Sequence, residues 1–406
     1  TMLSDDNVVA IVQQLEEMVG EFEKPKYFNY HTELCAHGVN GKTVCTRCID
    51  ACPAGAITSL VERISVDSNL CQGGGICATT CPSGAIEYVY PNLTDSGNRI
   101  RKTLQTFRAQ GGERIIVAFH TQDDFLPATT QAVLPVQVEE LGSVGMDLWL
   151  STLAYGADRV LLLQNGEVPE SVVDVLQQQI VIARTILSGL GLDPERITLQ
   201  SVDQEIQPVT TFHAIQPAEY SMPRQKRDAI FQAIEHFYRQ QDKTRELVSL
   251  PAGAAFGNAV VDAERCTLCL SCVSACPGNA LQDGSNRQLP EISFIEGRCI
   301  QCGTCTQTCP EDAISISPRL ILDREKRNQS RVLYQDKPFG CISCGKAFAT
   351  HSVIDKMTEA LKQHYMFKTP QSLSRLKMCE DCRVADIVQD PEAMAGNFDQ
   401  QSVKSA

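Results

Sequence analysis

The middle of the chain alternates between two periods of apolar residues. Four short apolar runs have the length of buried strands, at 114–119, 133–138, 159–163 and 196–202. Three longer segments carry apolar residues at helical spacing, at 146–155, 172–190 and 224–240. Strands that alternate with helices in this way predict an α/β domain with a mainly parallel sheet, which we place at residues 92–250.

On either side of this domain the periodic segments are fewer. Residues 8–22 have helical spacing, which predicts an N-terminal helix within residues 1–33. Residues 352–364 predict another helix near the opposite end of the chain. Closely spaced cysteines, rather than long periodic runs, mark the rest of both flanks.

Composition and charge limit the class of protein. The 406 residues leave room for two to four domains, and the 19 cysteines are the one unusual feature. A net charge of −13 without a long basic run argues against nucleic acid as a partner. No apolar run approaches about eighteen residues, so no membrane span is expected. The first residues lack the segments of an export signal, which favours the cytoplasm, although export together with a signal-bearing partner stays open.

Eight cysteines stand in two runs of the same spacing at 266–309. Each run reads C-x2-C-x2-C-x3-C-P, the spacing with which one small module holds two [4Fe-4S] clusters. The fourth cysteine of each run serves the neighbouring cluster. The first expected ligand set is therefore Cys266, Cys269, Cys272 and Cys309, and the second is Cys299, Cys302, Cys305 and Cys276. An intracellular chain argues against disulfides, and tetrahedral zinc needs no fourth cysteine followed by proline. Residues 251–318 thus resemble the bacterial two-cluster ferredoxins.

The same module recurs in degenerate form at residues 34–91. A motif of cysteine, proline, two further residues, alanine and then isoleucine or leucine begins at Cys52, Cys81, Cys276 and Cys309. Its proline fixes the backbone, and its last residue is expected to begin a short strand. In the first half of this module Lys42 occupies the position of a ligand, and Cys35 is its replacement from upstream. The expected ligand set is Cys35, Cys45, Cys48 and Cys81, with His37 as a competing ligand.

The second half of this degenerate module has lost one ligand. Cys71 and Cys77 keep their positions, but Gly74 stands where the cysteine between them belongs. Cys52, Cys71 and Cys77 therefore remain for this cluster. Three thiolates predict a [3Fe-4S] cluster, or a [4Fe-4S] cluster with one iron open to water or an outside ligand. The alternative is that the cluster has been lost and its cysteines are relics.

A third group of cysteines lies in residues 319–406. Cys341 and Cys344 form one C-x2-C pair, and Cys379 and Cys382 form another. Two such pairs predict a structural four-cysteine zinc site, although the 34 residues between them exceed the usual gap of a zinc ribbon. A further [4Fe-4S] cluster and a redox-active cysteine pair stay open as alternatives.

Three segments of the α/β domain carry a family resemblance: 114–119, 145–163 and 190–197. They resemble the delta subunit of the methyl-viologen-reducing hydrogenases, which is also found fused to heterodisulfide reductase subunits. The resemblance implies a fold that joins an electron-donating enzyme to its acceptor, and hence a docking role. The family carries cluster-binding cysteines in the loops after these strands, whereas loops 120–124, 139–142 and 164–167 have none. No cluster is expected there, and no glycine-rich motif predicts a nucleotide site.

Together these features predict the iron–sulfur electron-transfer subunit of a cytoplasmic oxidoreductase complex. Its cofactors would be three [4Fe-4S] clusters, a fourth cluster of the [3Fe-4S] or [4Fe-4S] type, and zinc at the third cysteine group. The expected catalytic partner is a hydrogenase, a formate dehydrogenase or a related molybdenum or tungsten enzyme. Two other functions stay open: a redox enzyme in its own right, using the three-cysteine cluster or a bound flavin, and a redox-sensing or assembly protein.

Overall fold

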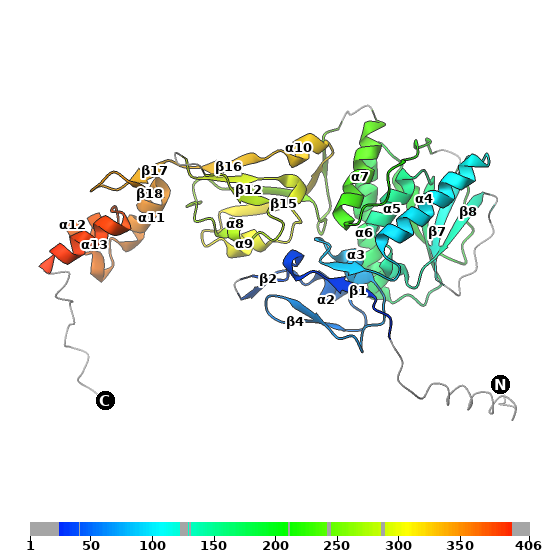
Figure 1. Cartoon of the computed structure of the whole chain (residues 1–406), viewed down its shortest axis with the longest axis horizontal. Helices are drawn as coiled ribbons and strands as arrows, with labels where there is room; N and C mark the ends of the chain where they lie inside the picture. Colours follow the sequence, from blue (N-terminus) through cyan, green and yellow to red (C-terminus); the bar gives the residue numbers. More distant parts are fainter. Residues whose placement is uncertain are drawn as a thin grey trace, which may run out of the picture.

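The computed structural model describes residues 24–39, 41–121, 129, 131–209, 212–241, 245–285 and 289–391. The helix predicted at 8–22 lies outside these residues. Figure 1 shows the described parts in a row, with the C-terminal helices at one end, a cysteine-rich module in the middle, and the α/β domain at the other end. The first cysteine-rich module lies beside the α/β domain and faces the second module (Figure 1).

A four-stranded parallel sheet forms the centre of the α/β domain. Its strands lie in the order β10 (Ile197–Ser201), β9 (Arg159–Gln164), β7 (Ile115–His120) and β8 (Ala132–Gln137). The other elements are α4 (Leu93–Ala109), η2 (Leu141–Ser143), α5 (Met146–Ala154), α6 (Glu170–Gly189), η3 (Pro194–Arg196) and α7 (Lys226–Arg239). The four predicted strands and three predicted helices are confirmed, each within two residues of its predicted limits. Helix α4 was not predicted, because most of its residues are polar and only Gly97, Ile100 and Leu104 are buried.

Both faces of the central strands are covered, which explains their continuous apolar sequences. One face, with Val117 and Leu162, belongs to the large core formed with helices α4 to α7. The other face, with Ala118 and Leu161, belongs to a smaller core completed by Ile206. Because the strands are parallel, their carboxyl ends meet at one edge of the sheet, next to η2 and the start of α5.

The two cysteine-rich modules repeat the same strand pairing. In the first module the antiparallel pairs are β1 (Phe28–Tyr30) with β6 (Ile86–Tyr88), and β4 (Ile57–Ser59) with β5 (Ile64–Val66). In the second they are β12 (Gly257–Val261) with β15 (Ile314–Ile321), and β13 (Leu281–Asp283) with β14 (Glu291–Phe294). The short helices are α2 (Arg47–Ala51) and α3 (Ile76–Thr80) in the first module, and α8 (Ser271–Ser274) and α9 (Thr304–Thr308) in the second. Strands β4, β6, β13 and β15 begin at the last residue of the repeated motif, as predicted.

The remaining elements extend these modules and form the C-terminal region. The first module adds η1 (Thr32–Leu34), β2 (Gly38–Val39) and β3 (Lys42–Thr43). The second adds β11 (Leu247–Ser249), η4 (Glu296–Arg298), α10 (Arg324–Asn328) and β16 (Arg331–Gln335). The C-terminal region contains β17 (Pro338–Gly340), β18 (Ala347–Thr350), α11 (His351–Leu361), η5 (Tyr365–Phe367), α12 (Pro370–Arg375) and α13 (Glu380–Gln389). Helix α11 confirms the helix predicted at 352–364.

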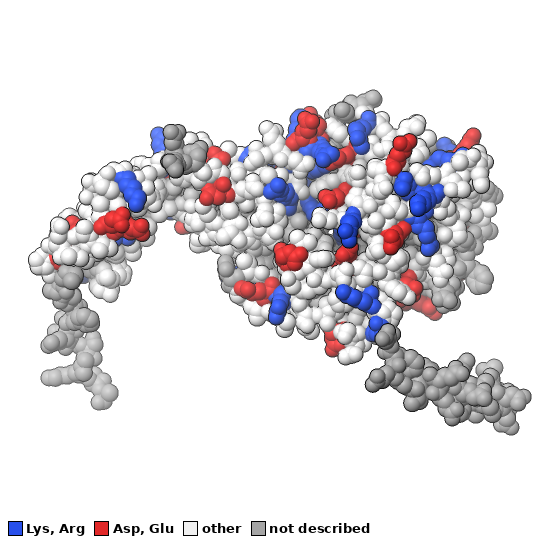
Figure 2. Space-filling model, viewed as in Figure 1, with Lys and Arg blue, Asp and Glu red and all other residues white. Residues whose placement is uncertain are grey.

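The surface and the helix lengths bear on the classes of partner. On the face shown in Figure 2, Lys and Arg side chains are interspersed with Asp and Glu, without the broad basic stripe typical of nucleic-acid-binding proteins. Within the described residues, none of the helices combines the length and the apolar character needed to cross a bilayer.

Candidate metal centres

The four turns that follow a Cys-Pro pair have the same backbone conformation. The third residue after each cysteine is left-handed, with φ of 58° at Gly55, 76° at Gly84, 48° at Asn279 and 46° at Asp312. Glycine, asparagine and aspartate are the residues that tolerate this conformation best. Each turn leads the chain away from the fourth cysteine of a run and into a strand, so the repeated motif has one structural role in all four places.

A second left-handed pattern surrounds the middle position of three of the four cluster-binding runs, the exception being the run around Cys45. Residues on either side of this position have positive φ, namely Leu268 and Leu270, Gln301 and Gly303, and Gly73 and Gly75. A left-handed conformation costs a non-glycine residue roughly 1–2 kcal/mol, and such strain is typical of ligand-binding loops. The loop from Cys71 to Cys77 has therefore kept this backbone, although its middle position is Gly74.

The structure brings the eight cysteines of the second module together in two groups. Burial, and then the neighbouring thiolate charges, raise the pKa of Cys272 to about 12, and these neighbours are Cys266, Cys269 and Cys309. The pKa of Cys305 is raised by burial and then by the charges of Cys302, Cys299 and Cys276. The two groups coincide with the two predicted ligand sets, whose role as ligands stays a prediction. Iron would relieve this crowding of thiolates, because coordination keeps a thiol deprotonated.

Backbone and side-chain N–H groups also point at individual sulfurs of the second module. The N–H of Leu268 lies 3.4 Å from Cys266 Sγ, and Gln301 Nε2 lies 3.3 Å from Cys299 Sγ. The N–H of Ala313 lies 3.3 Å from Cys309 Sγ. Such hydrogen bonds stabilise thiolates and are among the protein features that set the potentials of iron–sulfur clusters.

The first module groups its seven cysteines in a similar way. Burial is the main cause of the raised pKa of Cys48, followed by the charges of Cys81, Cys45, Cys77 and Cys35. Burial likewise raises the pKa of Cys77 to about 12, with further contributions from Cys52, Cys71 and Cys81. Cys48 thus has the three other members of its predicted set nearby, and Cys77 has both members of the three-cysteine set.

Two residues near the first set are engaged with other groups. His37 is buried, and its Nδ1 and Nε2 each lie 2.7 Å from a protein oxygen, those of Cys45 and Ser59 respectively. Both ring nitrogens therefore have protein partners, which argues against His37 as an iron ligand. Lys42, at the position of the missing cysteine, instead donates a hydrogen bond of 3.0 Å to the carbonyl of Gln307 in the second module.

The glycines on either side of Gly74 are closely packed, one against Tyr27 of the first module and the other against Ser143 of the α/β domain. A Cβ atom at Gly73 would lie 2.7 Å from the ring of Tyr27, and one at Gly75 would lie 2.5 Å from Ser143 of η2. By contrast, a Cβ atom at Gly74 would meet no heavy atom within 4 Å. The position of the absent fourth thiolate is therefore open space, next to a loop that is otherwise tightly held.

The four C-terminal cysteines form a compact group of a different kind. The sulfurs of Cys341, Cys344, Cys379 and Cys382 all lie within 4.8 Å of one another, and those of Cys344 and Cys379 are 3.8 Å apart. A tetrahedron with metal–sulfur bonds of about 2.3 Å has edges of about 3.8 Å. No other group of three or more cysteine, histidine or carboxylate side chains among the described residues is close enough to hold one metal ion. Cubic clusters are different, because each cysteine binds a separate iron and the sulfurs stay further apart.

Backbone donors prepare one of these cysteines for a metal. Burial acts to raise the pKa of Cys341, but N–H groups of Cys379, Cys344 and Ser343 outweigh it and lower that pKa to about 6. A thiolate is the form that binds metal. Cys341 follows β17, whereas Cys379 stands at the start of α13, so the site ties the hairpin to the last helix.

The C-terminal region and the first module both contact the second module close to its cysteines. Thr350 Oγ1 lies 3.4 Å from the carbonyl oxygen of Thr267, between Cys266 and Cys269. At the other side, Arg47 of the first module donates a hydrogen bond of 2.9 Å to Gly253. Burial raises the pKa of Cys45, and the charge of Cys302 in the second module contributes to this rise. The contact between the two modules, which we call the joint, therefore lies near enough to Cys45 and Cys302 for their charges to interact.

Sequence reasoning missed the two residues that hold this joint together. Lys226 donates hydrogen bonds to carbonyl groups of the first module, including that of Cys81, and Arg227 does so to the carbonyl of Cys299 in the second. One signal was present in the sequence. Two cations at the start of a predicted helix oppose the helix dipole, and such an unfavourable placement indicates a partner elsewhere.

Comparison with known families agrees with this geometry in three regions. A 4Fe-4S dicluster domain matches residues 265–314, and a 4Fe-4S binding domain matches residues 64–87. Another 4Fe-4S dicluster domain matches residues 298–350, which include Cys341 and Cys344. No curated protein matches the chain. The protein is therefore an iron–sulfur protein with several ferredoxin-type 4Fe-4S domains.

Proposed function

We propose that the protein is an electron-transfer subunit that relays electrons through four successive cysteine sets. A bound iron–sulfur cluster supplies one-electron transfer at each set. The sets follow one another from the C-terminal side of the second module to the far side of the first. In the proposed order, these sets are the ones that contain Cys266, Cys299, Cys45 and Cys71.

The observation that carries this proposal is the contact between the two modules, in which Lys42 and Arg47 donate hydrogen bonds to the carbonyl groups of Gln307 and Gly253. The cysteine-free α/β domain lies between the two modules in sequence. Gln307 lies between two predicted ligands, Cys305 and Cys309, so the contact brings the first module up to a cysteine set of the second. This contact supports one continuous path, with the three-cysteine set of Cys71 at one end.

The catalytic partner that we propose is a hydrogenase, a formate dehydrogenase or a related molybdenum or tungsten enzyme. The support is the resemblance of the α/β domain to the hydrogenase delta subunit, together with 19 cysteines that form no disulfide bonds. The α/β domain would dock the partner, while the cysteine sets on either side of it would pass on the electrons.

Anaerobic purification from the native host tests both the partner and the path. We expect a redox enzyme to co-purify, and the complex to reduce an acceptor with hydrogen or formate as the donor. Cys45→Ser, in the middle of the path, should abolish this coupled activity but leave dye reduction by the catalytic subunit intact. Lys102→Gln, an exposed change on α4, is the control and should have no effect. Full coupled activity of the Cys45→Ser complex, or the absence of any redox partner, would refute the proposal.

For the C-terminal site we propose structural zinc. The sulfur separation of 3.8 Å between Cys344 and Cys379 supports a single tetrahedral ion over a cube. Zinc and iron analysis of the full chain tests this proposal. Cys344→Ser should remove zinc and leave the iron content unchanged. Loss of iron instead would favour a further [4Fe-4S] cluster at this site.

One observation favours an alternative, a redox enzyme acting at the first module. The open space at Gly74 would leave an iron of a four-iron cluster accessible to a small ligand or substrate. A change in the cluster spectrum on addition of a small anionic or sulfur-containing compound would support this function. An unchanged spectrum would argue against catalysis at the three-cysteine set and leave electron relay as its proposed role.

A further inference from the structure

Helix α7 begins with two cations, where cations are electrostatically unfavourable. The free N–H groups of a first helical turn carry a partial positive charge, so lysine and arginine are normally found at the opposite end. Lys226 and Arg227 nevertheless occupy this turn, and both are half-buried. The contacts of their side chains explain the placement.

Lys226 binds the end of helix α3 in the first module. Its ammonium group donates hydrogen bonds to the carbonyl oxygens of Ala78, at 2.8 Å, and Cys81, at 3.3 Å, and also to that of Thr79. These three acceptors match the three donors of an ammonium group, and they are carbonyl groups that a helix end leaves without partners. The positive charge of Lys226 therefore lies against the backbone of a predicted iron ligand, Cys81.

Arg227 makes the corresponding contact with the second module. Its guanidinium donates to the carbonyl of Ala255 at 2.7 Å and to those of Gly297 and Cys299 at 3.0 Å each. The same group lies over the ring of Phe256, with its Cζ atom 4.9 Å from the ring centre. A planar group held by three hydrogen bonds and a ring contact has little freedom, so its charge is fixed beside Cys299.

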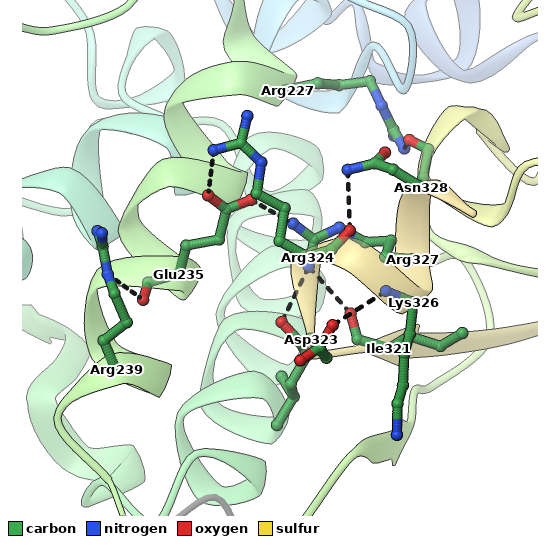
Figure 3. A network of polar contacts seen from close by, with 11 residues as sticks. Arg227, Glu235, Arg239, Ile321, Asp323, Arg324, Lys326, Arg327 and Asn328 are labelled. Carbon is green, nitrogen blue, oxygen red and sulfur yellow. Dashed lines mark hydrogen bonds and ion pairs between the residues drawn. The ribbon is translucent and has the colours of Figure 1, made fainter.

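The rest of α7 is tied to the second module at a separate point. Glu235 of α7 forms a 2.5 Å ion pair with Arg327 of α10, a fully buried arginine. Figure 3 shows this pair, with Arg227 reaching from α7 toward the same module. The helix therefore does not rely on Arg227 alone for its position, which allows the charge of Arg227 to be changed without detaching α7.

Burial and neighbouring charges act on the pKa of each cation in opposite directions. Burial lowers the pKa of Arg227 to about 10, and the charge of Cys299 opposes this change. Burial also lowers the pKa of Lys226, and the charges of Asp147 and of Cys81 act in the opposite direction. Each cation therefore has a negatively charged group close enough to favour its charged form.

We infer that Lys226 and Arg227 are positioning residues that tune the reduction potentials of the two cysteine sets facing each other across the joint. Reduction adds one electron to a set and breaks no bond, so the reduced form carries one more negative charge. A fixed positive charge nearby stabilises that form and raises the potential. Lys226 acts on the set that contains Cys81, and Arg227 on the set that contains Cys299. This inference rests on the proposed electron relay.

Anaerobic redox titration of the full chain, followed by electron paramagnetic resonance, tests the inference. Lys226→Gln and Arg227→Gln remove a charge but keep N–H donors for the carbonyl groups. Each variant should lower the potential of its own set by about 59 mV, which is a tenfold change in the ratio of reduced to oxidised form for one electron. Lys226→Arg and Arg227→Lys retain the charge and should keep potentials close to those of the wild type. Lys102→Gln, on exposed α4, controls for a remote charge and should shift neither set.

The outcomes separate tuning from a purely structural role. Unshifted potentials in both glutamine variants, with wild-type iron content, would overturn the inference. Equal shifts in the charge-retaining variants would overturn it too, since packing rather than charge would then be responsible. Iron loss in the glutamine variants would assign the cations to cluster assembly instead of tuning. Wild-type protein without any paramagnetic cluster would contradict the proposed relay itself, whereas a loaded wild type with unshifted variants contradicts only this inference.

Discussion

Gly74→Cys should restore the ligand that the first module lacks. The change places a thiol at the middle position of the loop between Cys71 and Cys77, which has kept the left-handed residues of a cluster-binding run at Gly73 and Gly75. We expect the three-cysteine set to become a four-cysteine set of the same type as that of Cys299. A wild-type [3Fe-4S] cluster would then gain one iron, and a wild-type [4Fe-4S] cluster would lose its open position.

The structure gives the size of the accompanying effect on stability. A Cβ atom at residue 74 would meet no heavy atom within 4 Å, so no steric cost arises. Gly74 is also absent from the residues with positive φ, unlike its two neighbours, so a non-glycine residue fits its backbone. Replacing a glycine under these conditions stabilises a protein by roughly 0.4–1 kcal/mol through the unfolded state. The variant should therefore fold at least as well as the wild type even without metal.

Iron analysis and electron paramagnetic resonance of anaerobically prepared protein provide the measurement. The signal of an oxidised three-iron cluster should disappear, and the signal of a reduced four-iron cluster should gain intensity. Gly74→Ser adds a Cβ atom with a poorer ligand and should leave the spectrum close to that of the wild type. Gly73→Cys is the positional control: it would bring Cβ to 2.7 Å from the ring of Tyr27 at a φ of 76°, and should reduce iron binding at this loop. A Gly74→Cys protein with the iron content and spectrum of the wild type would refute the reasoning.

Three further outcomes follow from individual contacts. In the metal-free protein, backbone N–H groups lower the pKa of Cys341 to about 6 despite burial, so its thiolate should persist above that pH and take up a proton as the pH falls through it; thiolate absorbance measured against Cys341→Ser follows this change, and a midpoint at the ordinary pKa of a thiol would contradict it. Glu296→Gln weakens two hydrogen bonds from Arg319, of 2.9 and 2.7 Å, to a buried carboxylate, and should cost about 1.5–3 kcal/mol in urea unfolding, with the exposed Glu264→Gln as control. Leu162 of the central sheet has no exposed surface, so Leu162→Ala should lower the free energy of unfolding by about 2–5 kcal/mol. The iron content per folded chain should stay constant. A loss of iron in proportion to the loss of stability would show that the modules do not fold independently of the sheet.

The sequence predicts the cysteine-rich loops well because metal geometry fixes the spacing of ligands. The repeated motif placed the starts of β4 and β15 at the correct residue, since proline and a left-handed turn leave one route out of each loop. The central strands could also be predicted from the sequence, because burial on both faces requires continuous apolar runs. Helix α4 could not be predicted, because only one narrow stripe of it is buried and its remaining surface is polar.

The two cations at the start of α7 indicate that partners exist, but the identity of these partners could not be predicted, for a physical reason. The acceptors of Lys226 and Arg227 are main-chain carbonyl groups, which every residue carries and no sequence motif distinguishes. The same holds for His37, whose partners are a carbonyl oxygen and a serine hydroxyl. Contacts of this kind depend on how folded units meet, and only a structure reveals them.

The cysteine-free α/β domain is therefore the part that fixes the relation between the two cysteine-rich modules. Their direct contacts include exposed hydrogen bonds from Lys42 and Arg47, and each such bond contributes about 0.5–1.5 kcal/mol, which is too little to hold two modules rigidly. Helix α7 makes the arrangement rigid, because its apolar side packs into the central core while its first turn binds both modules. Electron transfer weakens steeply as the separation of donor and acceptor grows. A change in the core beneath α7 should thus slow transfer between the modules without altering any cysteine, which would make the α/β domain part of the proposed relay as well as the proposed docking surface.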